Sequence, residues 1–92
     1  MTEVSRGQMA REEVELRAHD SDTAAFLLNG FDDAILGTVM IDDKLRVVYS
    51  YEMMIDVLMV RDQMTDEEAM EFIDYNCQMS FDNCPLILDE II

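Results

Sequence analysis

The last third of the chain, residues 62–92, combines a high acidic charge with a pattern of apolar side chains. It contains nine Asp and Glu residues and no Lys or Arg. A segment that is only charged cannot bury enough apolar surface to offset the entropy lost on ordering. This segment has apolar side chains at helix and strand spacing, namely Met64, Ala69, Met70, Phe72, Ile73, Leu86, Ile87 and Leu88. We therefore expect it to fold and to display its carboxylates on a folded surface.

The length and charge of the chain narrow the class of protein. Its 92 residues correspond to one domain with a modest core, and 50% of them are apolar. The formal net charge is −15, and residues 47–92 contain eleven acids against one base, Arg61. Such a charge repels nucleic acid and anionic membranes, and it accelerates association with basic partners. Solubility alone would also favour an acidic surface, so charge by itself does not identify a function.

Cysteine spacing and hydropathy indicate the cellular compartment. Cys77 and Cys84 are separated by six residues and match no C-x-x-C motif. We expect both to be reduced thiols. No apolar run reaches the length of about 18 residues that a membrane span requires, and the N-terminus lacks the apolar core of a signal peptide. These features predict a cytoplasmic protein.

The N-terminal third is polar at first and then apolar. Residues 1–22 are expected to form a flexible or partly helical arm, with a helix most favoured over residues 9–18, where Glu13 and Arg17 can pair. Residues 23–92 are expected to form the folded domain. Asp22 or Thr23 could cap a short helical turn over residues 24–28, which Asn29 and Gly30 would end.

The middle of the chain changes to a β pattern and then to a helical one. Residues 34–41 and 45–49 are rich in β-branched side chains, and the polar connection Asp42, Asp43 and Lys44 predicts a hairpin between them. Ser50 is placed to cap a core-facing helix over residues 51–61. Pro85 favours a last strand over residues 86–88.

Residues 65–68 fit a capping box, and they predict that a second helix begins at Asp66. Its buried stripe would contain Ala69, Phe72, Ile73 and Cys77. The resulting architecture is a small α+β fold: a β-hairpin, two amphipathic helices and a C-terminal strand, forming a three-stranded antiparallel sheet with the helices on one face. The C-terminal strand could also pair with a second copy to make a homodimer.

The best candidate for a functional surface is the set of carboxylates in the cation-free third of the chain. Glu67, Glu71 and Asp74 follow one side of the second helix, and like charges at this spacing repel. We expect the partner-binding residues to be Asp62, Asp66, Glu67, Glu71, Asp74, Asp82, Asp89 and Glu90. A rigid array of carboxylates can imitate a phosphate backbone and occupy a basic groove. A solvated helix face with no partner is the alternative.

The sequence offers no catalytic centre. The single histidine, His19, has no serine or cysteine context, and the three glycines form no phosphate loop. Asp32–Asp33 and Asp42–Asp43 could hold Mg²⁺ or Ca²⁺, but adjacent acids are more often turn residues. The run from Asp74 to Pro85 lacks the glycine and the glutamate of a calcium loop. We therefore expect a protein that is not an enzyme and that uses no metal or other cofactor.

Three segments resemble a family of short uncharacterised proteins encoded by bacteriophages. They are FDDAILG at residues 31–37, VVYSYEMMIDVLM at 47–59 and RDQMTDEEA at 61–69, with a weaker similarity at 84–87. Where that family often has an aspartate between the two tyrosines, this chain has Ser50. The resemblance implies a viral accessory protein that acts inside a bacterium, and it identifies no functional residue.

Two main functional hypotheses follow, and a small divalent-metal binder is a third alternative. The first is a phage accessory protein that inhibits a basic host protein, plausibly a nucleic-acid-binding defence complex, by presenting carboxylates in place of phosphate. The second is a structural or regulatory module that assembles through its apolar residues and uses its charge for solubility. Binding by carboxylates weakens steeply with salt, whereas apolar association does not, so ionic strength separates the two.

Overall fold

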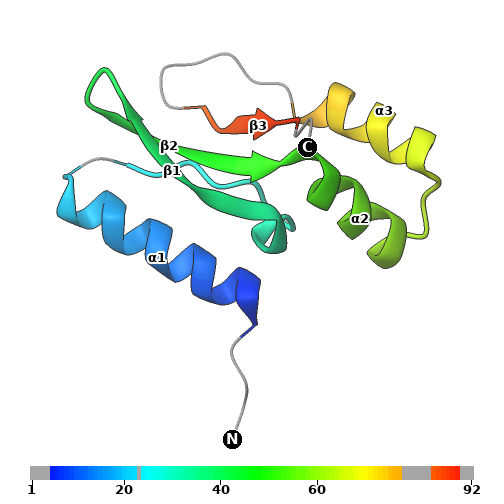
Figure 1. The fold of residues 1–92 in the computed structure, drawn as a ribbon, viewed down its shortest axis with the longest axis horizontal. Coiled ribbons are helices and arrows are strands. Elements are labelled where there is room, and N and C mark those ends of the chain that lie inside the picture. Colours follow the sequence, from blue (N-terminus) through cyan, green and yellow to red (C-terminus); the bar gives the residue numbers. More distant parts are fainter. Residues whose placement is uncertain (1–4, 23, 78–83, 90–92) are drawn as a thin grey trace, which may run out of the picture.

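The fold joins three α-helices to a small three-stranded sheet (Figure 1). It is seen in a computed structural model that describes residues 5–22, 24–77 and 84–89. The elements are helix α1 (Arg6–Asp20), the 3₁₀ turn η1 (Asp32–Ala34), strands β1 (Ile35–Ile41) and β2 (Lys44–Ser50), helices α2 (Tyr51–Arg61) and α3 (Asp66–Asn76), and strand β3 (Leu86–Leu88). The α+β class expected from the sequence is confirmed.

Strands β1 and β2 form the expected antiparallel hairpin. Ile41 pairs with Lys44 across a turn of only two residues, Asp42 and Asp43, whose φ angles are 52° and 64°. Aspartate tolerates this left-handed conformation, and turns of this type match the twist of a hairpin. An irregularity between Ile35 and Gly37 adds one residue to β1. The four acids that could have been metal ligands thus include two that form the hairpin turn.

The direction of the last strand differs from the expectation. The sheet has the order β1-β2-β3, but β3 runs parallel to β2, with Val48 opposite Leu86 and Ser50 opposite Leu88. The prediction of a purely antiparallel sheet is wrong. An antiparallel strand would begin near the end of β2, to which α2 and α3 return the chain, whereas β3 begins opposite Val48 and runs toward that end. Nine residues separate α3 from β3, a length that is sufficient for β3 to begin at the level of Val48 instead of at the end of β2.

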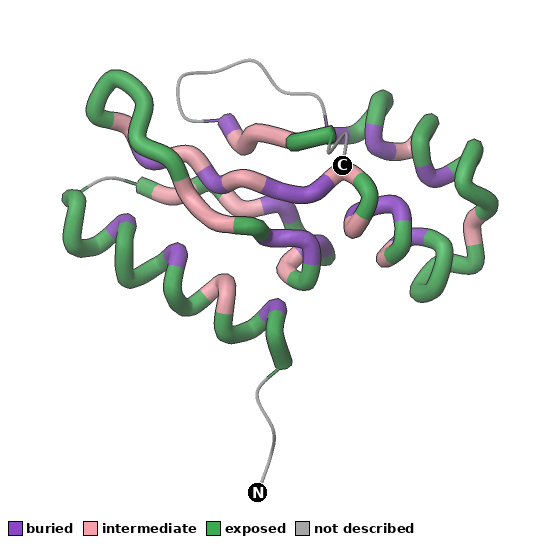
Figure 2. Tube along the Cα trace, viewed as in Figure 1, coloured by how far each residue is buried: buried purple, intermediate pink, exposed green. Residues whose placement is uncertain are grey.

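The helices also do not share one face of the sheet as predicted. In Figure 1, α1 lies along β1, whereas α2 and α3 extend as a pair from the end of β2. Helix α3 packs mainly on α2, and its buried Ala69 and Ile73 belong to the main hydrophobic cluster. Figure 2 shows that each helix is buried along one side only. The amphipathic patterns were therefore interpreted correctly, but the partner of α3 is a helix.

Helix α1 belongs to the core. It contains the helix expected over residues 9–18 and begins earlier, at Arg6, where the Ser5 hydroxyl accepts a hydrogen bond from the Gln8 N–H (3.1 Å). Val14 is only 2% exposed and packs in the main hydrophobic cluster. The Glu13–Arg17 ion pair is present at 3.1 Å.

No helical turn forms over residues 24–28, so that prediction is wrong. The backbone N–H of Leu28 donates to the hydroxyl of the fully buried Tyr49 at 2.8 Å, and Leu28 itself is buried in the core. A single helical turn would order several residues and form only one hydrogen bond. The hydrogen bond to Tyr49 and the burial of Leu28 therefore stabilise the extended segment more than a helical turn would. Gly30 does adopt the expected left-handed conformation, with φ 86°.

We predict that Gly7→Ala destabilises the protein and that Gly37→Ala does not. A Cβ at Gly7 would collide with Asp33 Oδ1 and lie 2.8 Å from the Asp33 backbone nitrogen, because α1 approaches η1 closely there. Overpacking of this kind costs about 1–3 kcal/mol. A Cβ at Gly37 would meet no atom within 4 Å.

Urea unfolding of the two variants measures the difference in the free energy of unfolding. Equal stability of Gly7→Ala and the native protein would show that α1 does not need its close approach to η1.

Candidate functional site

Helix α3 begins with the capping box predicted from the sequence. The Thr65 hydroxyl accepts from the Glu68 N–H at 3.2 Å, and the Glu68 carboxylate accepts from the Thr65 N–H at 2.9 Å. The hydrogen bond that the Glu68 carboxylate accepts from the Thr65 backbone N–H, followed by its interaction with the Thr65 side chain, lowers the pKa of Glu68. Asp66 accepts from the Glu67 N–H at 2.9 Å. Asp66 and Glu68 therefore stabilise the positively polarised start of the helix.

Glu67, Glu71 and Asp74 form an exposed line on α3, which we call the acidic stripe. They lie on the opposite side from the buried Ala69 and Ile73, as the period of the sequence predicted. The rise of an α-helix spreads the three charges over about 10 Å, at intervals of about 6 and 4.5 Å. Among the residues that the structure describes, no Lys, Arg or His bonds to any of the three.

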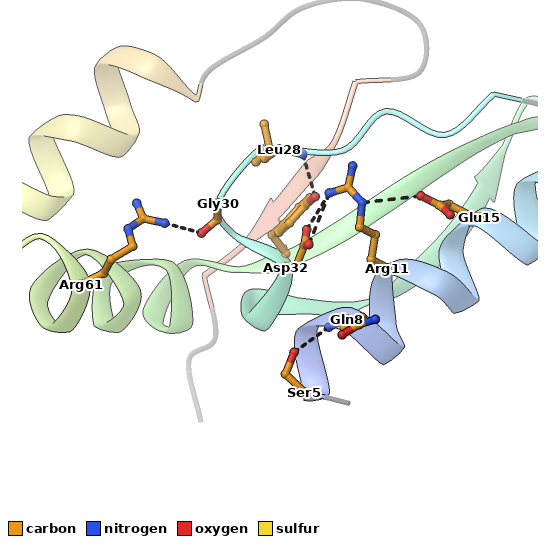
Figure 3. A network of polar contacts seen from close by, with 9 residues as sticks. Ser5, Gln8, Arg11, Glu15, Leu28, Gly30, Asp32 and Arg61 are labelled. Carbon is orange, nitrogen blue, oxygen red and sulfur yellow. Dashed lines mark hydrogen bonds and ion pairs between the residues drawn. The ribbon is translucent and has the colours of Figure 1, made fainter. Parts of the chain in front are cut away.

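The arginines are committed elsewhere, to contacts that join distant parts of the chain. Arg6 donates to the Asp33 carbonyl at 2.6 Å, Arg11 pairs with Asp32 at 3.0 Å, and Arg17 donates to the Thr38 hydroxyl at 3.0 Å. Arg46 donates to the Cys84 carbonyl at 2.8 Å, and Arg61 to the Gly30 carbonyl at 2.7 Å. Figure 3 shows the contacts of Arg11 and Arg61. In the described part of the chain, no arginine therefore pairs with the acidic stripe.

Two residues that the sequence grouped with the stripe have other surroundings. Asp62 accepts a hydrogen bond from Arg61 and pairs with it at 3.1 Å, which lowers the pKa of Asp62 and compensates its charge. Asp66 is exposed but engaged in the helix cap. Both lie near the start of α3. Because their carboxylates already have partners, they contribute less uncompensated negative charge to this surface than Glu67 does.

Asp89, the residue directly after β3, and Asp74, at the other end of the stripe, both act on Tyr51. Burial raises the pKa of Tyr51, and the negative charges of Asp74 and Asp89 raise it further. The two carboxylates, fifteen positions apart in sequence, therefore lie near the same phenol. The fold thus brings part of the predicted set together. Asp82 and Glu90, the remaining predicted residues, lie outside the described residues.

Tyr75 is a candidate contact residue that the sequence reasoning missed. It is 90% exposed, and it follows Glu71 by one helical turn. Aromatic side chains at interfaces supply large contact areas and often dominate binding energy. The signal was available in the sequence, because Tyr75 stands about 200° round the helix from the buried Ile73.

The remaining candidate residues have structural contacts. Asp32 pairs with Arg11, and the Cys84 sulfur accepts a hydrogen bond from Arg46 at 3.0 Å. Cys77 and Cys84 are buried and form no disulfide with each other, and burial raises the pKa of Cys77. Within the described part of the chain, no group of three His, Cys, Asp or Glu side chains is arranged to hold a metal ion. The described helices include none with the length and apolar character of a membrane span.

Comparison with known proteins returns no match to a family model, a curated protein or a solved structure. The resemblance to phage-encoded proteins therefore rests on the sequence motifs alone.

The capping box makes a prediction about pH. Because the pKa of Glu68 is lower in the folded chain, its ionised form stabilises the fold. This contribution is complete above the usual glutamate pKa of about 4.3 and is lost as the pH falls through the lowered value. We expect Glu68→Gln to be less stable than the native protein at neutral pH and the difference to shrink in acid. Thr65→Ala should cost about 1 kcal/mol.

Urea unfolding at about pH 7 and at about pH 3 checks the sign of this linkage. Glu71→Gln is the matched control on the same helix, because the described structure gives its carboxylate no hydrogen bond. A loss for Glu68→Gln that is the same at both pH values would contradict the assignment.

Proposed function

We propose that this protein is a non-enzymatic accessory protein of a bacteriophage that binds a basic host protein through the acidic stripe. The partner class that fits best is a nucleic-acid-binding complex of host defence, which the protein would inhibit by occupying its phosphate-binding groove. The observation that carries the proposal is the stripe itself: three exposed carboxylates on one rigid helix, with every described arginine engaged in other contacts.

The charge spacing supports imitation of a phosphate backbone. Neighbouring charges of the stripe are separated by about 4.5–6 Å along the helix axis. One strand of duplex DNA carries a charge about every 3.4 Å along its axis. The stripe therefore has a charge density somewhat below that of a single DNA strand. Arginine and lysine side chains, which hold phosphate by charge and hydrogen bonds, can hold carboxylates in the same way.

The energetics of the free helix also favour a cationic partner. Like charges one turn apart cost a helix about 0.2–0.5 kcal/mol per pair. A basic groove would remove this repulsion, and the net charge of −15 would accelerate the encounter. Tyr75 would then supply an aromatic contact beside the charges, since it lies one turn from Glu71.

The first prediction concerns the stripe. We expect the triple variant Glu67→Gln, Glu71→Gln and Asp74→Asn to lose its partner in a pull-down from bacterial lysate. Native protein should retain the partner at about 50 mM salt and release it at about 500 mM, where charges are screened within a few ångströms. Duplex DNA should also displace the bound protein if both compete for one groove.

A matched control separates the position of the charges from their number. Glu12→Gln, Glu15→Gln and Asp20→Asn change the net charge equally but lie on α1. This control should retain the partner. If both triple variants lose it equally, only net charge matters and the stripe is not the site. Partners that resist salt and DNA would favour the alternative function, a module that assembles through apolar contacts.

The second prediction concerns Tyr75. Tyr75→Ala should weaken binding of the captured partner by about tenfold, the effect of losing an aromatic contact of about 1.4 kcal/mol. Tyr75→Phe should bind nearly as well as the native protein, because the ring remains. Val60→Ala is the control, since Val60 is also highly exposed (83%) but lies on α2. Titration calorimetry with the purified partner measures all three, and unchanged affinity for Tyr75→Ala would exclude Tyr75 from the interface.

A further inference from the structure

The outer edge of β1 is open in the described part of the chain. The sheet order places β2 on one side of β1 and no described strand on the other. Ile41 and Lys44 close a two-residue hairpin, so they exchange hydrogen bonds, and the bonded positions then alternate along β1. The N–H and C=O groups of Thr38 and Met40 consequently point away from β2, toward the open edge.

This edge is apolar and carries no charge. None of the seven residues of β1 is ionisable, although 29% of the chain is charged. Four of its side chains are exposed, namely Leu36 (41%), Val39 (37%), Met40 (49%) and Ile41 (39%). Edge strands of monomeric proteins are usually short or protected by charges or proline. The opposite edge strand, β3, follows that rule, because it has three residues and is followed by Asp89.

Helix α1 extends the apolar surface beside this edge. Ala10, Glu13, Val14 and Arg17 face Ile35–Thr38 across an open cleft of about 120 Å³. That volume is well below the 300–1,000 Å³ of typical small-molecule sites, and it suits a single side chain. Met9 and Leu16, exposed by 60% and 58%, stand one turn to either side of Glu13 on the same flank of the helix.

The distribution of charge favours a second copy of this chain as the partner of the β1 edge. The acids of this chain attract basic partners to other faces and make copies of the chain repel one another there. The described charges near β1 have both signs. Glu13 and Arg17 pair at 3.1 Å, Arg6 donates to the Ile35 carbonyl at 3.5 Å, and the hairpin end adds Asp42, Asp43 and Lys44. The edge is thus the place where two molecules of charge −15 can approach with the least repulsion.

We propose that a second copy of this chain adds its β1 antiparallel to this edge, so that two sheets join into one across a twofold axis. In such an arrangement each copy contributes the same surface, and Thr38 and Met40 of both copies supply the new hydrogen bonds. Side chains of one copy enter the cleft between β1 and α1 of the other. Helix α3 lies on the β3 side of the sheet (Figure 1), so the dimer carries its two acidic stripes away from the interface.

Sedimentation equilibrium of the full chain over a range of concentrations tests the dimer. We expect the native protein to dimerise, and we expect added salt to strengthen the dimer by screening the repulsion between copies. Met40→Lys places a charge at the edge, and Met40→Pro removes an outward N–H without breaking a bond to β2. Each should raise the dimer dissociation constant by at least about tenfold.

Two matched variants make the result specific. Val60→Lys adds the same charge on an exposed position of α2 and should leave the dissociation constant unchanged. Leu88→Lys tests the alternative of a homodimer through the C-terminal strand, and it should also have no effect. A monomeric native protein at all concentrations, or a dimer lost with Leu88→Lys and retained in both Met40 variants, would overturn the proposal.

Hydrogen exchange of the native protein gives an independent readout that needs no variant. The amides of Thr38 and Met40 should exchange more slowly as the protein concentration rises, because the partner strand protects them. Exchange at these two amides that is independent of concentration, in a sample shown to dimerise, would exclude this edge as the interface.

Discussion

The structure depends on the placement of five arginines in a chain that has 21 acids. Each arginine contacts a residue more than twenty positions away, and the contacts tie α1 to η1 and β1, α2 to the segment before η1, and β2 to the start of β3. A chain of this charge repels itself, and that repulsion opposes the compact state. The arginines offset this repulsion where elements meet, because the planar guanidinium group can donate to carbonyl and to carboxylate oxygens.

This allocation also determines which surfaces remain for other molecules. Because the arginines make internal contacts, Glu67, Glu71 and Asp74 have no ion pair among the described residues. The edge of β1 is the opposite case, because it has neither charges nor a neighbouring strand in the described part of the chain. The molecule therefore presents one strongly charged surface and one neutral apolar surface, on different sides of the sheet. Salt should act on them in opposite directions, since it screens attraction at the first and repulsion at the second.

Local features could be predicted from the sequence because nearby residues satisfy them. The capping box at Thr65 and Glu68, the cap at Ser50 and the turn at Asp42–Asp43 each involve atoms only a few positions apart. The stripe followed from the helical period in the same way. Features that need a distant partner were missed. Residues 24–28 are not helical because Tyr49 takes the N–H of Leu28, and the contact of Arg61 with the Gly30 carbonyl joins positions 31 residues apart. The pairing of Asp62 with Arg61 was also missed, although these two residues are neighbours in sequence.

The sequence by itself determined the β1–β2 hairpin, the helices α2 and α3 with the residues where they begin, and the line of carboxylates that α3 exposes. Backbone propensity, side-chain caps and hydrophobic period act within a few residues, so they can be predicted from the sequence. Only the tertiary structure decided that β3 runs parallel to β2, that α3 packs on α2, that Asp89 and Asp74 both act on Tyr51, and that β1 has one neighbouring strand among the described residues. These outcomes depend on how surfaces far apart in sequence bury each other, which no local pattern encodes.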